Sequence, residues 1–498
     1  MGIVAKQSAR NTVALSTGFL LGAINTTYVL PAAFEGFEEG WGLLRILTAW
    51  GTILAQILAL GTPNGILRFL PKAETPEREA SMLGALCTIP AVLFATLGVA
   101  VSLLGQEWLV SLDADSGYLL QDRMAAFLFM AGAYLALLLL KSALTHRMRT
   151  VTVTVVQEVW LKGSYLALAV VYLQGWMPFD TFFRWFLYTY AAAVAMLLLE
   201  AWSVKLRPAQ PQFRKDIKPF LEYGLYALWN DGSRVIAKNL DVVMVGALLG
   251  LAVVPKYTFA FFIATVVALP LRAMTPILRA LTSKAVSELG PEQSQGELQQ
   301  AARVQLIATS TLLTAIWAGM PALDLALPEA YRGLQWVILA VGLSYVAQSA
   351  GGTAGAILQF SNRFRWAMPV NLGFVLMTVV TNLFFIKGLN MGVEGAALAT
   401  AMTALLNFGV RTTLMWRLFR IHPFSGGWWV VAGLAAMVGL AASFLSVPTE
   451  ALGWGKVWNV VHAFVRGGLA GGLVLGTSWA LGALPELTTE MQKRLSKS

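Results

Sequence analysis

Charge and cysteine are scarce in this chain of 498 residues. Only 12% of the residues are charged, about half the share found in soluble proteins, and 57% are hydrophobic. The single cysteine, Cys87, excludes an internal disulfide and a cysteine metal cluster. The three histidines lie far apart in the sequence, which argues against a histidine-based metal or catalytic site. The composition therefore predicts a protein that crosses a membrane many times.

The hydrophobic runs predict an all-α, polytopic membrane protein with about fourteen transmembrane helices. They fall at approximately 10–30, 41–66, 80–105, 118–141, 150–173, 181–204, 219–249, 254–283, 302–322, 332–360, 366–387, 393–418, 428–447 and 460–483. The first residues lack the hydrophobic core and cleavage site of a removable signal peptide. We therefore expect the first span itself to direct the chain to the membrane.

The charged loops predict the orientation of the chain. When the helices are threaded alternately, most of the basic residues fall on one side, and the other side holds the acids Glu35, Glu38, Glu39, Glu107, Asp113 and Asp115. By the positive-inside rule, both termini are predicted to be cytoplasmic. The net charge of +10 is spread over many short loops, so we expect no nucleic-acid partner.

An internal duplication is indicated by a shift of 213 residues, which aligns Thr62-Pro63 with Thr275-Pro276 and Arg207 with Arg420. Six helices separate the copies, so the two six-helix repeats share one orientation in the membrane. The predicted organisation is an N-lobe (1–207), a cytoplasmic linker (208–218), a C-lobe (219–420), and two further helices with a cytoplasmic tail (421–498). Parallel repeats are typical of transporters, with the binding site between the two lobes.

The predicted helix 219–249 carries four charged residues, Asp231, Arg234, Lys238 and Asp241. Their offsets of 3, 7 and 10 residues place them on one stripe of a helix. Each charge costs roughly 2.5–3.5 kcal/mol at mid-membrane on insertion scales, so we expect them to face protein or a water-filled cavity. Pairing at the i, i+3 spacing within the bundle is the alternative role.

Other charges within predicted spans are Arg45, Glu158, Lys162, Glu222 and Arg272, and the bases outnumber the deeply placed acids Asp231 and Asp241. A basic cavity suits an anion, because guanidinium groups bind phosphate oxygens through two parallel hydrogen bonds. The predicted substrate-binding residues are Arg45, Arg234, Lys238, Arg272 and Lys162. The residues predicted to couple an ion or to pair charges are Asp231, Asp241 and Glu158. We expect no metal and no cofactor, apart from a coupling Na⁺ or H⁺.

Two segments resemble the polysaccharide-transporter branch of the multidrug/oligosaccharidyl-lipid/polysaccharide (MOP) flippase superfamily. They are NLDVVMVGALLGLAVVPKYTFAFFIATVVALPLRAMTPILRALTSK at 239–284 and WGLLRILTAWGTILAQILALGTPNGILRFLP at 41–71. The resemblance implies that the chain moves a polyprenyl-pyrophosphate-linked oligosaccharide, such as an O-antigen or lipopolysaccharide precursor, across a bacterial or archaeal cytoplasmic membrane by alternating access. It places Arg45, Arg272, Asp231 and Asp241 in the central cavity. Flippases of the O-antigen type commonly have twelve spans, and fourteen is closer to the lipid II flippase.

The resemblance also implies partners, which are the lipid-linked substrate, membrane lipids, and the polymerase and glycosyltransferases of cell-surface polysaccharide synthesis. A multidrug/cation antiporter of the same superfamily is the nearest alternative, but it would need acids to bind its substrate. A membrane glycosyltransferase or polymerase is a further alternative, for which Asp113 and Asp115 could hold a metal. We expect a transporter and not an enzyme, because the loops are too short for a catalytic domain.

Overall fold

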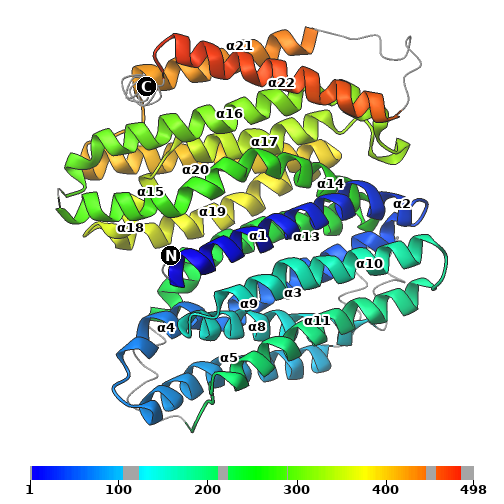
Figure 1. Cartoon of the computed structure of the whole chain (residues 1–498), viewed down its shortest axis with the longest axis vertical. Helices are drawn as coiled ribbons and strands as arrows, with labels where there is room; N and C mark the ends of the chain where they lie inside the picture. The colour runs from blue at the N-terminus through cyan, green and yellow to red at the C-terminus, as the bar shows by residue number, and fades with distance from the viewer. Residues whose placement is uncertain (1–2, 105–122, 211–222, 289, 445–455, 484–498) are drawn as a thin grey trace. The chain divides into compact units, whose positions relative to one another are not determined.

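The protein is helical wherever its structure is described. The computed structural model describes residues 3–104, 123–210, 223–288, 290–444 and 456–483, and no strand occurs within them (Figure 1). The predicted all-α class is therefore confirmed. The chain divides into two compact units, Met1–Pro255 and Lys256–Ser498. The loop with Asp113 and Asp115, most of the predicted linker and the C-terminal tail lie outside the described residues.

Ten of the described helices are long and apolar enough to cross a membrane. An eleventh span results if α17 (Gln335–Ala350) and α18 (Ala354–Phe360), which meet with a bend of 47°, are counted together. The predicted spans 150–173 and 219–249 are not among the ten. The charged side chains that single out these two helices also lower their hydropathy. The predicted total of fourteen spans is therefore not confirmed.

The first unit is a bundle of antiparallel helices. Its elements are α1 (Ile3–Ile24), η1 (Asn25–Val29), α2 (Leu30–Ala33), α3 (Glu38–Ala59), α4 (Thr62–Phe69), η2 (Leu70–Lys72), α5 (Pro76–Leu104), α8 (Met124–His146), α9 (Thr150–Thr154), η3 (Val155–Trp160), α10 (Leu161–Leu173), α11 (Phe179–Ser203), η4 (Leu228–Gly232), α13 (Ser233–Leu249) and η5 (Leu251–Val253). Three of these, η1, η3 and η4, are π-helical turns within longer helices. Such turns are rare and often mark functional sites.

Polar contacts identify the two ends of this unit. At the N-terminal end, Gln7 Nε2 donates to the carbonyl oxygen of Met148 over 2.9 Å, and Arg149 Nε lies 3.6 Å from Glu200 Oε1. The start of α1, the α8–α9 junction and the end of α11 therefore lie together. At the opposite end, a salt bridge of 2.8 Å joins Arg123 and Asp180, which precede or begin α8 and α11. Successive helices thus alternate in direction, as the threading predicts.

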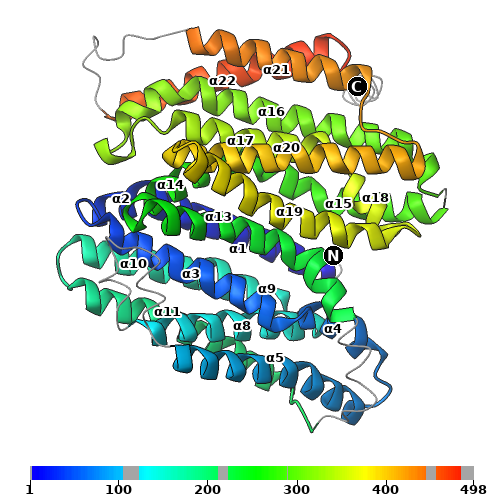
Figure 2. The same ribbon diagram turned by 180° about the vertical axis from the view of Figure 1, so that it is seen from behind.

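The seventh helix packs against α3 in the first unit (Figure 2). It is continuous from 223 to 249 and includes η4 and α13. At one end of the contact, Gly42 leaves room for the carbonyl oxygen of Leu251, and at the other Gly61 leaves room for that of Gly224. The duplication assigns this helix to the second lobe, whereas its packing assigns it to the first unit. The lobe boundaries inferred from the repeat stay a prediction.

The second unit surrounds one long helix. It includes most of α14 (Val254–Ala264), then η6 (Thr265–Ala268), α15 (Leu269–Glu288), η7 (Glu292–Ser294), α16 (Gln295–Ala326), η8 (Glu329–Tyr331), α17, α18, η9 (Phe364–Trp366), α19 (Ala367–Asn382), η10 (Leu383–Gly388), α20 (Gly392–Phe419), α21 (Gly426–Phe444) and α22 (Lys456–Ala480). The long helix, α16, packs against α17, α21 and α22. The backbones of α16 and α22 approach closely at Gly319 and Gly467, where a side chain would overlap the facing carbonyl. Small residues commonly mediate such contacts between membrane helices.

Candidate functional site in the first helical unit

Arg45 lies inside the first unit on α3. This helix begins with Glu38 and Glu39, whose charges complement its N-terminus. Arg45 is seven residues further on, about 10 Å along the axis. Its side chain is half-buried, and Nη1 lies 3.5 Å from Thr48 Oγ1. No described carboxylate forms a salt bridge with it, and its Nε atom is buried without a hydrogen-bond partner in the described part of the chain. A buried donor without a partner costs about 1–3 kcal/mol, and a bound anion would remove that cost.

Three tyrosine hydroxyls on other helices lie within the electrostatic range of Arg45. The charge of Arg45 acts on the hydroxyls of Tyr134 (α8), Tyr165 (α10) and Tyr190 (α11). The hydroxyls of Tyr134 and Tyr190 are hydrogen-bonded over 3.1 Å, and on α3 the hydroxyl of Thr52 donates to the carbonyl oxygen of Thr48. Together these groups form a polar region in the interior of the unit, which suits a ligand rich in oxygen atoms.

Lys162 and Glu158 form a salt bridge of 2.6 Å on the helix that carries Tyr165. Glu158 lies in the π-helical turn η3, and Gly18 of α1 packs so closely that a Cβ there would lie 2.6 Å from the Glu158 Cβ. The side chains are 29% exposed for Glu158 and 39% for Lys162, so the pair reaches accessible space. Because Lys162 is neutralised by Glu158, Arg45 remains the cation in this region whose charge no described carboxylate balances.

The charged residues of the seventh helix differ in burial. Asp241 is only 5% exposed, whereas Arg234 and Lys238 are exposed. All three have polar or electrostatic partners. Asp231 belongs to the π-helical turn η4, and its side chain lies outside the described residues. The side chains of Arg234, Lys238 and Asp241 lie on one face of the helix, but only those of Arg234 and Lys238 are exposed.

Arg272 belongs to the second unit, on α15 one turn before Pro276. Its side chain is exposed and makes no hydrogen bond or salt bridge with the described residues. The structure thus collects seven of the eight predicted site residues in the first unit and places the eighth in the second. The roles predicted for all eight stay predictions.

The hydroxyl groups around Arg45 were not among the predicted site residues. Tyr134, Tyr165 and Tyr190 each lie near the middle of a predicted span and not at its edge, where interfacial tyrosines are usual. This position is a signal that sequence reasoning could have used. Thr48, which contacts Arg45, and Thr52 follow Arg45 at offsets of three and seven residues on the same helix face.

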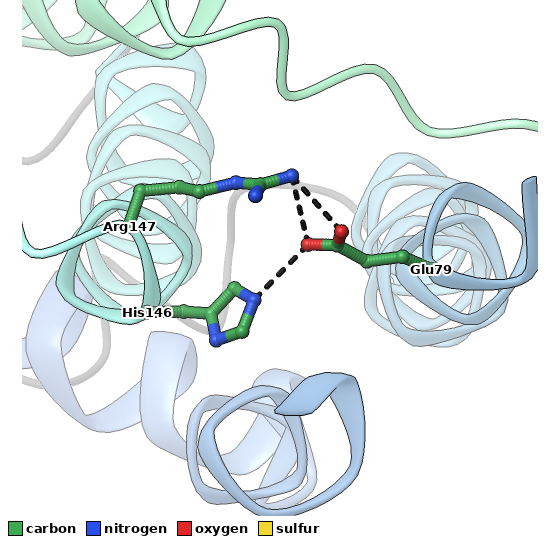
Figure 3. Close-up of polar contacts among 3 residues, drawn as sticks. All are labelled: Glu79, His146 and Arg147. Atoms are coloured by element: carbon green, nitrogen blue, oxygen red, sulfur yellow. Dashed lines mark hydrogen bonds and ion pairs between the residues drawn. The ribbon is translucent and has the colours of Figure 1, made fainter. Parts of the chain in front are cut away.

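A second polar cluster lies at the N-terminal end of the first unit. The carboxylate of Glu79 on α5 accepts hydrogen bonds of 3.0 Å from His146 and Arg147, which end α8 (Figure 3). Both carboxylate oxygens of Glu79 contact Arg147. The three side chains lie at neighbouring helix ends, and the negative charge of Glu79 is paired with the positive charge of Arg147. The cluster therefore ties α5 to α8.

We expect Glu79→Gln to lower the free energy of unfolding by about 1 kcal/mol, because it removes the charge that Arg147 pairs with at a partly screened position. Thermal unfolding of the purified protein measures the change. Glu77→Gln removes the same charge from an exposed position two residues away and serves as the control. Equal melting temperatures for the two variants would contradict the structural role of Glu79.

Among the described residues, no group of three histidine, cysteine or acidic side chains is placed to hold a metal ion. A Na⁺ or H⁺ coupled to transport needs no such group, so the predicted coupling ion is untested.

Comparison with known proteins finds a matching family and several solved structures with a similar fold. The model of a family described as "polysaccharide biosynthesis protein" matches residues 8–281. The structure is similar to that of the lipid II flippase MurJ in an inward closed conformation, with a TM-score of 0.70 at 11% identity over 97% of this chain and 100% of that one. No curated protein matches the sequence significantly.

Transporters of the multidrug resistance MATE family share the fold at lower similarity. An inward-facing MATE transporter of the MOP superfamily gives a TM-score of 0.53 at 14% identity over 90% of this chain and 97% of that one. An outward-facing one gives 0.50 at 14% identity over 83% and 96%. Identities this low establish the fold alone. The predicted resemblance to the MOP superfamily is confirmed, and the chain has a multi-pass membrane fold.

Proposed function

Because the chain belongs to the family of polysaccharide biosynthesis proteins, we propose that it is a transporter that moves a polyprenyl-pyrophosphate-linked oligosaccharide across the cytoplasmic membrane. The observation that carries the proposal is Arg45, a half-buried guanidinium with an unpartnered Nε and no described carboxylate beside it. A pyrophosphate supplies the negative charge and the acceptor oxygens that this group lacks. The MOP fold, built from two helical lobes, suits alternating access.

The polar region around Arg45 suits the rest of such a substrate. Tyrosine and threonine hydroxyls give and accept hydrogen bonds with sugar hydroxyls, and the polyprenyl chain stays in the lipid. Arg234, Lys238 and Arg272 are proposed as further substrate-binding residues. The substrate would cross the membrane as inward-open and outward-open states interconvert.

The basic residues of the first unit favour one orientation. Its N-terminal end carries Lys72, Arg78, Arg147, Arg149, Lys205 and Arg207, whereas Glu35, Glu38, Glu39 and Asp180 lie at the opposite end. The positive-inside rule then puts the N-terminal end in the cytoplasm. We propose that the substrate enters from that side, and that Asp231 or Asp241 binds a coupling Na⁺ or H⁺.

A multidrug/cation antiporter is the second candidate, and the MATE-like fold is what favours it. Such a protein needs an acid that is available to a cation. Within the first unit, Glu158 is held by Lys162 over 2.6 Å, and Asp241 is buried with a partner of its own. An anionic substrate therefore fits the described side chains better.

Complementation of a flippase-deficient bacterial strain tests the proposed function. We expect the chain to restore surface polysaccharide and to clear the lipid-linked oligosaccharide that accumulates on the cytoplasmic side. The vector without insert is the control, and drug susceptibility is measured in the same strains. Increased drug resistance without any restored export would favour the antiporter instead.

A further inference from the structure

The short helix α18 has one face that two arginines from other helices contact. It follows α17 at a bend of 47° and packs against α15, α19 and α20. Arg279 of α15 donates from Nη2 to Gln359 Oε1 over 2.5 Å. Arg411 of α20 lies against Gly355, where an added Cβ would overlap its Nη1 atom. Gly355 and Gln359 are four residues apart and therefore lie on the same face of α18, about one helical turn from each other.

The side chain of Gln359 directs Arg279 toward Arg411. Long side chains in a helix point back toward its N-terminus, onto the residue four positions earlier, which for Gln359 is Gly355. Because Gly355 has no side chain, the space over it admits the end of Gln359, and the guanidinium of Arg411 reaches the same space. Arg279, bonded to the end of Gln359, is thereby held on the same part of the surface.

Neutral amides position both arginines, which are half-buried. Arg411 donates from Nη2 to Asn371 Oδ1 over 2.7 Å and from Nε to Asn407 Oδ1 over 3.1 Å. Arg279 makes its hydrogen bond to Gln359 and no salt bridge within the described part of the chain. Amide oxygens orient a guanidinium group, but they carry no negative charge that would offset it.

Acids are rare on the helices that form this region. Among the described residues of α15, α18, α19 and α20 there are two, Glu288 and Glu394. Glu288 lies 3.9 Å from Lys284, and Glu394 lies about 25 Å before Arg411 along α20. Two positive charges on one face repel each other, and an anion between them removes that repulsion. A phosphate suits this position, because guanidinium groups bind its oxygens through pairs of hydrogen bonds.

The loop after α18 indicates that this region lies at a membrane surface. Residues 363–366, with the sequence Arg-Phe-Arg-Trp, are all exposed. Basic side chains that alternate with aromatic rings are typical of the boundary between a membrane and water. A hydrophobic cluster that includes Val286, Leu358 and Phe419 joins the ends of α15, α18 and α20, so the basic residues at these ends lie together. The positive-inside rule then assigns this boundary to the cytoplasmic leaflet.

We propose that Arg279 and Arg411 form a binding site for the phosphate of a lipid in the cytoplasmic leaflet. Basic sites between membrane helices on this side commonly bind lipid head groups. A glycerophospholipid of the bilayer and the polyprenyl-pyrophosphate substrate before its transport both present such a phosphate. The site belongs to the second unit, so it does not depend on the role proposed for Arg45.

Gln359→Glu tests the site, because it keeps the shape of the side chain and its contact with Arg279 but neutralises the positive charge. Binding of dioleoyl phosphatidylglycerol and of farnesyl pyrophosphate is measured on the purified full-length protein in detergent, with dioleoylglycerol as the counterpart that lacks a phosphate. We expect Gln359→Glu to weaken phosphate-dependent binding roughly tenfold, the loss typical of one hydrogen bond to a charged group. Its melting temperature should equal or exceed that of the wild type, because the new carboxylate pairs with Arg279.

Gln300→Glu is the matched control, because it adds the same charge at an exposed position near the start of α16, at the same end of the unit. A loss confined to phosphatidylglycerol would identify a bilayer lipid as the ligand, and a loss confined to farnesyl pyrophosphate would identify the substrate. If Gln359→Glu lowers the melting temperature, Asn371→Asp repeats the test by neutralising Arg411. Unchanged binding of both phosphate lipids in a folded variant, or an equal loss of dioleoylglycerol, would overturn the proposed site and leave the proposed function standing.

Discussion

Arg45→Ala is expected to reduce export of the glycan about a hundredfold, which corresponds to roughly 3 kcal/mol of lost binding to the pyrophosphate. Two charge-assisted hydrogen bonds from a guanidinium account for that amount. The alanine variant should fold normally, because Arg45 has no described salt-bridge partner to leave behind and its Nε is already unpartnered. Export is measured as surface polysaccharide per amount of inserted protein in the complementation strain.

Two further variants make this result specific. Arg45→Lys keeps the charge but loses the planar fork, so we expect an intermediate loss of roughly tenfold. Arg184→Ala, on an exposed position of α11, controls for the removal of an arginine. Arg272→Ala is also expected to reduce export, because Arg272 is proposed as a further substrate-binding residue. Wild-type export by normally inserted Arg45→Ala and Arg272→Ala proteins would refute the pyrophosphate site.

The helical membrane fold could be predicted because it follows from composition and run length. Twenty apolar residues without water must satisfy their own backbone hydrogen bonds, and a helix does so locally. The number of spans was harder to predict, because charged side chains within a membrane helix lower its mean hydropathy. The helices with Glu158 and with Asp241 are well formed and yet fall below the hydropathy of their neighbours.

The candidate site was predictable only in its charges. Arg45 and Lys162 stand out in a sequence because ionised groups are costly in a membrane. The pairing of Lys162 with Glu158 follows from their i, i+4 spacing and is visible in the sequence, whereas the lack of a described carboxylate beside Arg45 depends on which helices are its neighbours. Tyr134 and Tyr190 meet because α8 packs against α11, which is likewise a property of the tertiary structure.

The packing of the seventh helix was also beyond the sequence. Its charged stripe indicated a buried face, but the repeat pattern said nothing about which helix would cover it. The structure covers Asp241 within the first unit and leaves Arg234 and Lys238 exposed. The contact with α3 depends on glycines at both ends, and glycines in membrane helices are too common to predict a particular contact.

Gly61→Ala is expected to destabilise the first unit by about 3 kcal/mol, the combined cost of left-handed backbone and of overpacking. Gly61 has a φ of 70°, and an added Cβ would overlap the carbonyl oxygen of Gly224 on the seventh helix. Gly175, with a φ of 72° and open space around it, is a matched control that carries the backbone cost without the contact.

For a unit of this size, we expect the melting temperature of Gly61→Ala to fall by roughly 5–10 °C, and that of Gly175→Ala by much less. Gly224→Ala, whose Cβ would meet the Leu60 carbonyl, should reproduce the overpacking part of the loss. Equal melting temperatures for Gly61→Ala and Gly175→Ala would mean that the seventh helix does not rest on α3 through this contact.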